Sequence, residues 1–150
     1  MKHRILPGKP DDIRNLILRK EDLAELKAGC SILPSIQLFD SWVASAMRWT
    51  IWIDKKVAGV FGCSGKAGKV GVPWLLGSEL LTKVPEVFVI DAPKYVDMMQ
   101  ERYKFLFNYV HEENRISTRW LQWLGFKLKD PAPYGEFGNP FRYFYRAPNV

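Results

Sequence analysis

The chain is poor in the residues that build metal centres and redox sites. Its 150 residues include only two cysteines and two histidines. Cys30 and Cys63 do not stand in a metal-binding spacing, and a cytosolic location favours two reduced thiols over a disulfide between them. We therefore expect no metal site. We also expect a structural role for Cys63, because no histidine is tied to it in sequence as a nucleophile would require.

Long apolar runs are also missing. No stretch approaches the roughly 18 apolar residues of a membrane span. The basic residues at positions 2–4 are not followed by the apolar segment of a signal peptide. We therefore expect a soluble cytoplasmic protein with no membrane partner.

Acidic residues are fewer than basic ones. The sequence has 22 Lys and Arg against 16 Asp and Glu, a formal net charge of +6. This balance permits an acidic partner, such as a coenzyme phosphate or a nucleic acid. The basic residues are scattered over the whole length, however, so we favour a solvating role over a nucleic-acid-binding stripe.

The chain is rich in hydrophobic residues, and these recur at the spacings of helices and strands. Hydrophobic residues make up 47%, and six are Trp, enough for one domain over residues 1–150 with a core of its own. A short strand at 2–6 is followed by helices that open at Pro10, at 21–27 and at 35–47. In the last of these, Ile36, Phe39, Val43 and Met47 recur at helical spacing. Residues 48–54 and 57–64 then alternate as a β-hairpin, and 69–76 form a third strand.

The second half begins with a helix over residues 93–103, because Pro93 suits only a first turn. A strand at 105–111 leads into an amphipathic helix at 114–124, for which Asn114 is a favoured N-cap. In this helix Ile116, Trp120, Trp123 and Leu124 form one apolar stripe. We predict that both Trp side chains are buried. Strands at 126–129 and 141–146 follow, separated by a Pro- and Gly-rich loop.

The pattern from Asn114 to the Leu124-Gly125-Phe126 end resembles the last motif block of the GCN5-related N-acetyltransferase (GNAT) fold. The order of the other segments is similar to that family as well, most of all to a divergent branch of small proteins of tailed bacteriophages. The resemblance implies an α/β fold, with one mixed and mainly antiparallel sheet flanked by helices on both sides. It also implies that the strands at 69–76 and 105–111 separate, and that an acyl-coenzyme lies in the opening.

The resemblance further implies acetyl-CoA as cofactor. In the family, a Gly-rich loop after the fourth strand holds the pyrophosphate through backbone amides. That loop is absent here, and Pro73 removes one amide donor. Gly77 and Ser78 remain at this place and could offer amides to an anion; the alternative is that they form a plain turn. The residues that the resemblance assigns to the coenzyme are Trp74, Leu75, Gly77, Ser78 and Asn114.

The family's frequent general acid is a Tyr, and Leu121 stands at that position here. Leucine cannot protonate a leaving thiolate, so the acid must come from elsewhere. Tyr109 lies on the strand that faces the opening, where a core aromatic is the alternative. His111 ends this strand and is a candidate base, since histidine titrates near neutral pH; a surface histidine is the alternative.

Two functions follow from the resemblance. The first is acyl-CoA-dependent N-acyl transfer to an amine acceptor. The second is a non-catalytic role on the same scaffold, as a phage protein that binds a phage or host protein or takes part in virion assembly. The missing loop and the missing Tyr favour the second function more than they would in a typical member. An acyltransferase would be located in the cytoplasm, which is that of the host if a phage encodes the protein. For the non-catalytic role, the virion is a further expected location.

Overall fold

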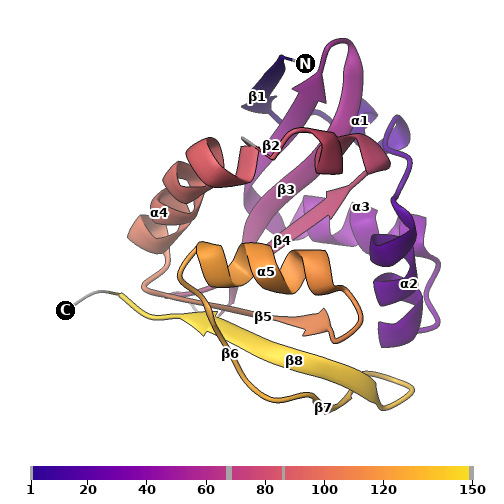
Figure 1. Ribbon diagram of the computed structural model, residues 1–150, viewed down its shortest axis with the longest axis vertical. Helices are drawn as coiled ribbons and strands as arrows, with labels where there is room; N and C mark the ends of the chain where they lie inside the picture. Colours follow the sequence, from indigo (N-terminus) through magenta and orange to yellow (C-terminus); the bar gives the residue numbers. More distant parts are fainter. Residues whose placement is uncertain (1, 67–68, 86, 149–150) are drawn as a thin grey trace.

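The computed structural model describes residues 2–66, 69–85 and 87–148. Its strands form one sheet in the order β1-β2-β3-β4-β5-β8-β6, with β7 paired to β8. In Figure 1, α4 and α5 lie in front of this sheet and α3 lies behind it. The mixed, mainly antiparallel sheet with helices on both sides is confirmed. Within the described ranges, no helix is long and apolar enough to cross a bilayer.

The element bounds are close to those predicted. The strands are β1 (His3–Pro7), β2 (Ser45–Ile53), β3 (Lys56–Lys66), β4 (Val70–Gly77), β5 (Phe105–His111), β6 (Lys127–Leu128), β7 (Ala132–Tyr134) and β8 (Asn139–Arg146). The helical elements are α1 (Pro10–Arg14), α2 (Lys20–Gly29), α3 (Pro34–Ala44), the 3-10 turn η1 (Glu79–Lys83), the π turn η2 (Val87–Asp91), α4 (Ala92–Arg102) and α5 (Arg115–Trp123). The predicted loop at 130–140 contains β7, which sequence alternation did not reveal.

Strands β2, β3 and β4 form the antiparallel arrangement predicted as a β-hairpin and a third strand, and β1 adds to it at the edge. β2 and β3 join at a tight turn where Asp54 has a φ of 55°, a left-handed conformation that Asp tolerates. β1 pairs with β2, and β4 pairs with β3 over its whole length. This half of the sheet is therefore built from neighbours in sequence.

Helix α3 differs from the prediction in length and in its buried face. It ends at Ala44, because the residues from Ser45 onward pair with β3 and Met47 lies opposite Cys63. The predicted apolar stripe is exposed: Ile36 by 46%, Phe39 by 52% and Val43 by 56%. The side that packs inward carries Leu38 and Trp42, and an indole buries more apolar area than the stripe's side chains can.

Helix α4 begins where the proline requires. Pro93 lies in the first turn, and the helix ends at Arg102. The resemblance extends this helix back to Glu86, which lies outside the described residues. From Val87 to Asp91 the chain forms the π turn η2, which leads directly into α4.

Helix α5 is rotated about its axis relative to the prediction. Thr118, which is not part of the predicted apolar stripe, is buried, and Leu121 packs against the core. Trp120 is partly buried, but Trp123 is 62% exposed, so the prediction that both Trp side chains are buried was wrong. The rotation follows from Asn114, which is buried by polar contacts at the start of the helix and so fixes its inward face.

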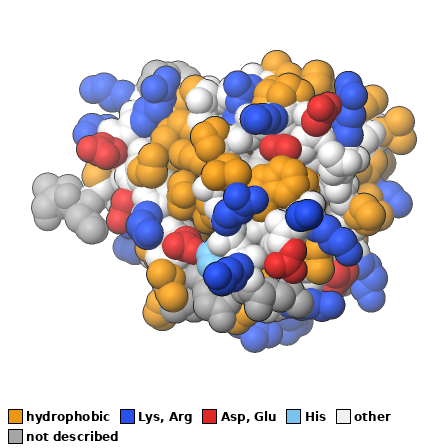
Figure 2. Space-filling model, turned by 90° about the horizontal axis from the view of Figure 1, so that it is seen from above, with side chains coloured by type: hydrophobic (Ala, Val, Ile, Leu, Met, Phe, Trp, Pro, Cys, Tyr) orange, Lys and Arg blue, Asp and Glu red, His pale blue; other side chains and the backbone are white. Residues whose placement is uncertain are grey.

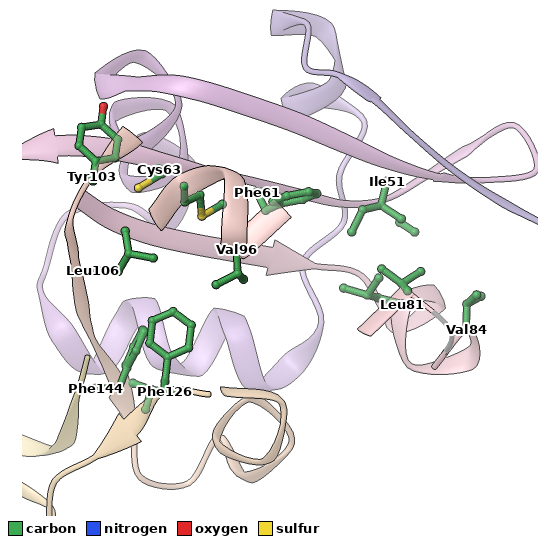
Figure 3. Close-up of a cluster of buried hydrophobic side chains, with 14 of the residues drawn as sticks. Ile51, Phe61, Cys63, Leu81, Val84, Val96, Tyr103, Leu106, Phe126 and Phe144 are labelled. Carbon is green, nitrogen blue, oxygen red and sulfur yellow. The ribbon is translucent and has the colours of Figure 1, made fainter. Parts of the chain in front are cut away.

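Two apolar clusters lie on the two faces of the sheet. The larger joins α4, α5 and the front face, and Figure 3 shows Val96, Leu106, Phe126 and Phe144 among its side chains. Cys63 is fully buried within it, and burial raises the pKa of its thiol to about 12. A thiol held protonated in this way fits the structural role predicted for it.

Gly62 lies where β2 and β3 approach closely. A Cβ at this position would clash with the carbonyl oxygen of Met47, which is a backbone atom that cannot swing away. We expect Gly62→Ala to lower the free energy of unfolding by about 2–3 kcal/mol in a urea titration. Gly29→Ala is the matched control, because its Cβ would make only an ordinary 3.7 Å contact with Phe141. Equal stability of the two variants would contradict this close approach.

Candidate functional site

Strands β4 and β5 separate in the middle of the sheet. They are parallel neighbours, but they pair only at Val70 with Phe105 and at Gly71 with Leu106. Farther along, the strands are joined by a side chain, since Asn108 Nδ2 donates to the carbonyl oxygen of Pro73 at 2.8 Å. The predicted separation of these two strands is therefore present. It opens the sheet toward the carboxyl ends of both strands.

A pocket of about 460 Å³ occupies this opening. Its walls come from strands β4, β5, β7 and β8 and from helices α2, α3 and α5. Most of the lining is apolar. Leu75 on β4 packs in the same cluster as Trp120 and Leu121 of α5, whereas Trp74 points to the opposite face of the strand and packs in the cluster that includes Leu38 and Trp42 of α3. The pocket is therefore lined by helices from both faces of the sheet.

Glu25, on α2, is the titratable carboxyl group of this pocket. Its Oε1 accepts from the backbone N–H of His111 at 2.8 Å and from Asn114 Nδ2 at 3.3 Å. Burial raises the pKa of Glu25 to about 7, and the nearby Asp22 carboxylate adds to the rise. The two hydrogen bonds and Arg19 oppose the rise without cancelling it. Glu25 therefore changes charge near neutral pH, as a general base must.

Sequence reasoning missed Glu25. Asp22 and Glu25 are three residues apart on α2 and so share one face of that helix. Two carboxylates on the inner side of a helix are the signal that would have pointed to this site. The distance in sequence hid it, because the groups that hold Glu25 lie 86 and 89 residues away.

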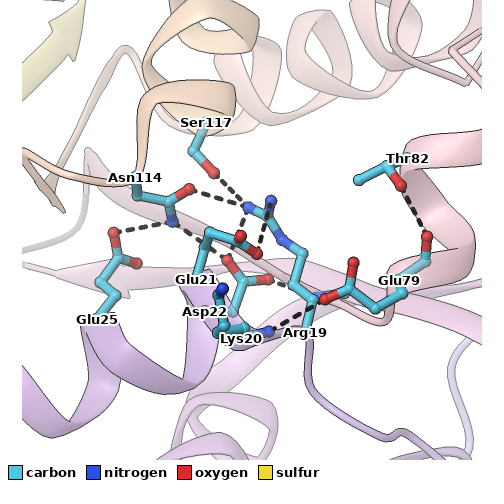
Figure 4. A network of polar contacts seen from close by, with 10 residues as sticks. Arg19, Lys20, Glu21, Asp22, Glu25, Glu79, Thr82, Asn114 and Ser117 are labelled. Carbon is cyan, nitrogen blue, oxygen red and sulfur yellow. Dashed lines mark hydrogen bonds and ion pairs between the residues drawn. The ribbon is translucent and has the colours of Figure 1, made fainter.

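Next to Glu25, a buried polar network joins α2 to α5 (Figure 4). The side chain of Arg19 is only 1% exposed. Its Nη2 contacts Asp22 Oδ1 at 2.8 Å, Asn114 Oδ1 at 3.1 Å and Ser117 Oγ at 2.8 Å. The guanidinium also lies 5.2 Å from the centre of the Trp120 ring. Arg19 therefore holds the wide end of the opening together.

Asn114 stands at the N-cap position of α5, as predicted, but its side chain makes no capping hydrogen bond. Instead its amide donates to Asp22 and Glu25 and accepts from Arg19. The predicted capping hydrogen bond is therefore absent, because the side-chain amide of Asn114 binds the charged groups of α2 instead. The other role predicted for Asn114, contact with the coenzyme, stays a prediction.

Gly77 and Ser78 lie at the end of β4, where the resemblance places a pyrophosphate. The Gly77 N–H donates to Asp22 Oδ2 at 2.8 Å, and the Ser78 N–H donates to the carbonyl oxygen of Ala58 at 2.8 Å. The Ser78 hydroxyl caps η1 by accepting from the Leu80 N–H. Both amides are thus engaged within the protein, and a carboxylate stands where a phosphate would have to be.

These contacts decide which parts of an acyl-coenzyme the described residues fit. The apolar opening, lined by Trp74 and Leu75, suits an extended acyl arm. The strand end does not suit the pyrophosphate, because Asp22 occupies the Gly77 amide and would repel a second anion. A pyrophosphate at this place would require Asp22 to move.

The two predicted catalytic residues are placed differently. Tyr109 lines the pocket, with its ring stacked on Tyr134 at 3.9 Å between centroids. The imidazole of His111 packs edge-on against Phe141 at 5.0 Å and is not part of the pocket lining. His111 contributes to the site through its backbone N–H, which holds Glu25.

Comparisons with known proteins concern the fold. No family model and no curated protein matches the sequence. Solved structures do match along nearly the whole chain. An acetyltransferase of the GNAT family from Streptococcus pneumoniae is 13% identical with a TM-score of 0.70, covering 99% of this chain and 100% of that one. A spermidine N-acetyltransferase from Vibrio cholerae, in complex with CoA and spermine, is 9% identical with a TM-score of 0.69, covering 97% and 95%.

A third match is an acetyltransferase from Bacillus subtilis in complex with CoA. It is 13% identical with a TM-score of 0.68, and the alignment covers 99% of this chain and 100% of that one. At such low identity the likeness establishes the fold alone. The chain has the GNAT fold, as the motif from Asn114 to Phe126 predicted.

Proposed function

We propose that the protein is an acyl-CoA-dependent N-acyltransferase that works in the pocket between β4 and β5, with Glu25 as its general base. The observation that carries the proposal is a carboxyl group with a pKa of about 7 inside this pocket. The matched acetyltransferases from Vibrio cholerae and Bacillus subtilis have CoA in their complexes, which supports an acyl-coenzyme as donor here.

Glu25 prepares the acceptor. Glu25 lines the pocket from α2, so an amine bound in the pocket can meet its carboxylate. An ionised Glu25 takes a proton from the ammonium form of the acceptor and so leaves a neutral amine whose nitrogen has a free electron pair. A bound acyl-coenzyme supplies the acyl group as a thioester. The phenol of Tyr109, on the same pocket wall, is the proposed proton donor to the leaving group.

A second function rests on a different observation. Because Asp22 accepts from the Gly77 amide and Ala58 from the Ser78 amide, neither of these two amides is free where the family binds pyrophosphate. This favours a non-catalytic protein that keeps the scaffold for binding, and the phage and virion roles belong to this second proposal. An assay with acetyl-CoA and a mixed panel of amines separates the two, since only the enzyme forms an acylated product.

Coenzyme binding tests the role of Asp22 directly. We expect isothermal titration to show weak binding of acetyl-CoA to the unmodified protein. Asp22→Asn should strengthen this binding on the order of tenfold, because it removes the negative charge beside the proposed phosphates. Asp97→Asn is the control, since its exposed carboxylate pairs with Arg146 away from the pocket. Saturable binding in neither the unmodified protein nor Asp22→Asn would end the acyl-CoA proposal and leave the binding role.

A further inference from the structure

The back of the second half of the sheet carries a row of aromatic rings. Alternate residues of a strand point to opposite faces, so Leu106 and Val110 point into the core and the residues between them point away. The aromatic face consists of the outward rings of β5 and β8 that lie outside the pocket, all partly exposed and none in an apolar cluster: Phe105, Phe107, Tyr143 and Tyr145.

The rings of the aromatic face form a continuous ladder. Phe105 stacks on Tyr145 with centroids 5.9 Å apart, and Tyr145 stacks on Tyr143 at 5.8 Å. Phe107 lies 5.8 Å from Tyr143, which continues the row across the two strands. Figure 1 shows α5 on the other side of β5 and β8, where the buried face packs. A sheet face of this kind is left open to a partner.

Three lysines surround the aromatic face. Lys66 Nζ lies 5.6 Å from the centre of the Phe107 ring, and Lys129 Nζ lies 5.8 Å from that of Tyr145. Lys127 is registered opposite Tyr145, so its side chain is on the same face. None of the described strand positions on this face is acidic.

This grouping could not be seen in the sequence. Lys66 is far from Lys127 and Lys129 along the chain, and the pairing of β4 with β5 brings them to one face. On the face seen in Figure 2, by contrast, basic side chains are scattered among apolar ones. The expectation that all basic residues merely solvate the surface therefore does not extend to the aromatic face.

We propose that the aromatic face of β5 and β8, with Lys66, Lys127 and Lys129, binds single-stranded nucleic acid. Aromatic rings on an open sheet accept the flat faces of unpaired bases regardless of sequence, and the lysines attract the phosphates. The charge excludes a second copy of this chain as the occupant, because two such faces would bring like charges together. This activity is separate from acyl transfer.

Fluorescence anisotropy with a labelled single-stranded oligothymidylate tests the proposal. We expect saturable binding that weakens with salt, with a slope of log affinity against log salt of about −2 for the three lysines. Phe107→Ala and Tyr143→Ala should each weaken binding roughly 5- to 100-fold, since each removes a stacking ring. Neither residue lines the pocket, so neither change is expected to alter acetyl-CoA binding.

Charge variants keep the test valid if the aromatic variants fail to fold. Lys66→Glu with Lys129→Glu changes two exposed side chains and should weaken binding at least tenfold. Lys55→Glu with Lys56→Glu makes the same charge change at the β2–β3 turn and should weaken binding much less. Equal losses in the two pairs would overturn the proposal, as would no binding at low salt. Equal competition by polyglutamate would overturn it in favour of an acidic polypeptide.

Discussion

Replacing Glu25 with Gln should lower kcat/KM for acyl transfer roughly 10²–10⁴-fold, the usual contribution of a general base. The amide keeps the shape of the side chain and can still accept from the His111 N–H, but it cannot take a proton. The unmodified enzyme should gain activity as pH rises through about 7, where Glu25 ionises, and then level off. In Glu25→Gln this rise should disappear.

Two further variants serve as controls: one makes the same chemical change at another position of α2, and the other removes the alternative general base. Glu21→Gln makes the same chemical change on α2, at a side chain that is 34% exposed and outside the pocket lining, and it should leave the pH profile intact. His111→Ala removes the base expected from the sequence. Loss of the rise near pH 7 in His111→Ala, together with its retention in Glu25→Gln, would assign the proton transfer to His111.

The same carboxyl group links stability to pH. The pKa of Glu25 is raised by the fold from 4.5 to about 7, so between these values the folded protein binds more protons than the unfolded chain. Its contribution to stability is therefore complete below pH 4.5 and is lost as pH rises through 7. From pH 5 to pH 8, Glu25→Gln should gain roughly 1 to 3 kcal/mol relative to the unmodified protein. Thermal melts at the two pH values measure this gain without any assay of activity.

Replacing Arg19 with Met should lower the free energy of unfolding by about 3–5 kcal/mol, as expected when one partner of a buried ion pair is removed. Met has the length to fill the space but leaves Asp22, itself 2% exposed, without its counter-charge. Asn114 and Ser117 lose a partner at the same time. Urea titration at pH 7 provides the measurement.

The double variant Arg19→Met with Asp22→Asn tests the mechanism. If the cost comes from an uncompensated buried carboxylate, neutralising Asp22 should restore a large part of the stability. Arg14→Met is the control, because the Arg14 side chain is 83% exposed and its loss should change stability by less than about 1 kcal/mol. Additive losses in the double variant would show that packing of the guanidinium, and not charge, is the source.

The strands and turns were predictable because they depend on neighbours in sequence. Alternation fixed β2, β3 and β4, and Asp54 marked the turn of the hairpin. The choice of buried face was not predictable from periodicity alone. Helix α3 has apolar residues on two sides, and the side that contains Trp42 is the buried one. In α5 the buried contacts of Asn114 fix the inward face of the helix, and Trp123 is therefore exposed.

The candidate site was predictable in place but not in chemistry. The resemblance located the opening between β4 and β5, and the structure has it there. The groups that give it chemistry come together across long distances: Arg19 meets Asn114 over 95 residues, and Glu25 meets the His111 N–H over 86. No local pattern encodes such contacts, since they depend on how α2 packs against the end of β5.

The short pairing between β4 and β5 also has a consequence for how the chain folds. Strands β2, β3 and β4 follow one another with short connections, so this part of the sheet can form early from local contacts. Joining β5 to it closes a loop that contains η1, η2 and α4, yet the joint gains only two paired positions. The entropy of that closure has to be offset by side chains, through α4 packing on both strands and Arg19 reaching α5. We therefore expect the joining of β5 to β4 to limit the rate of folding, so that the contacts that shape the pocket also determine how fast the two halves of the sheet combine.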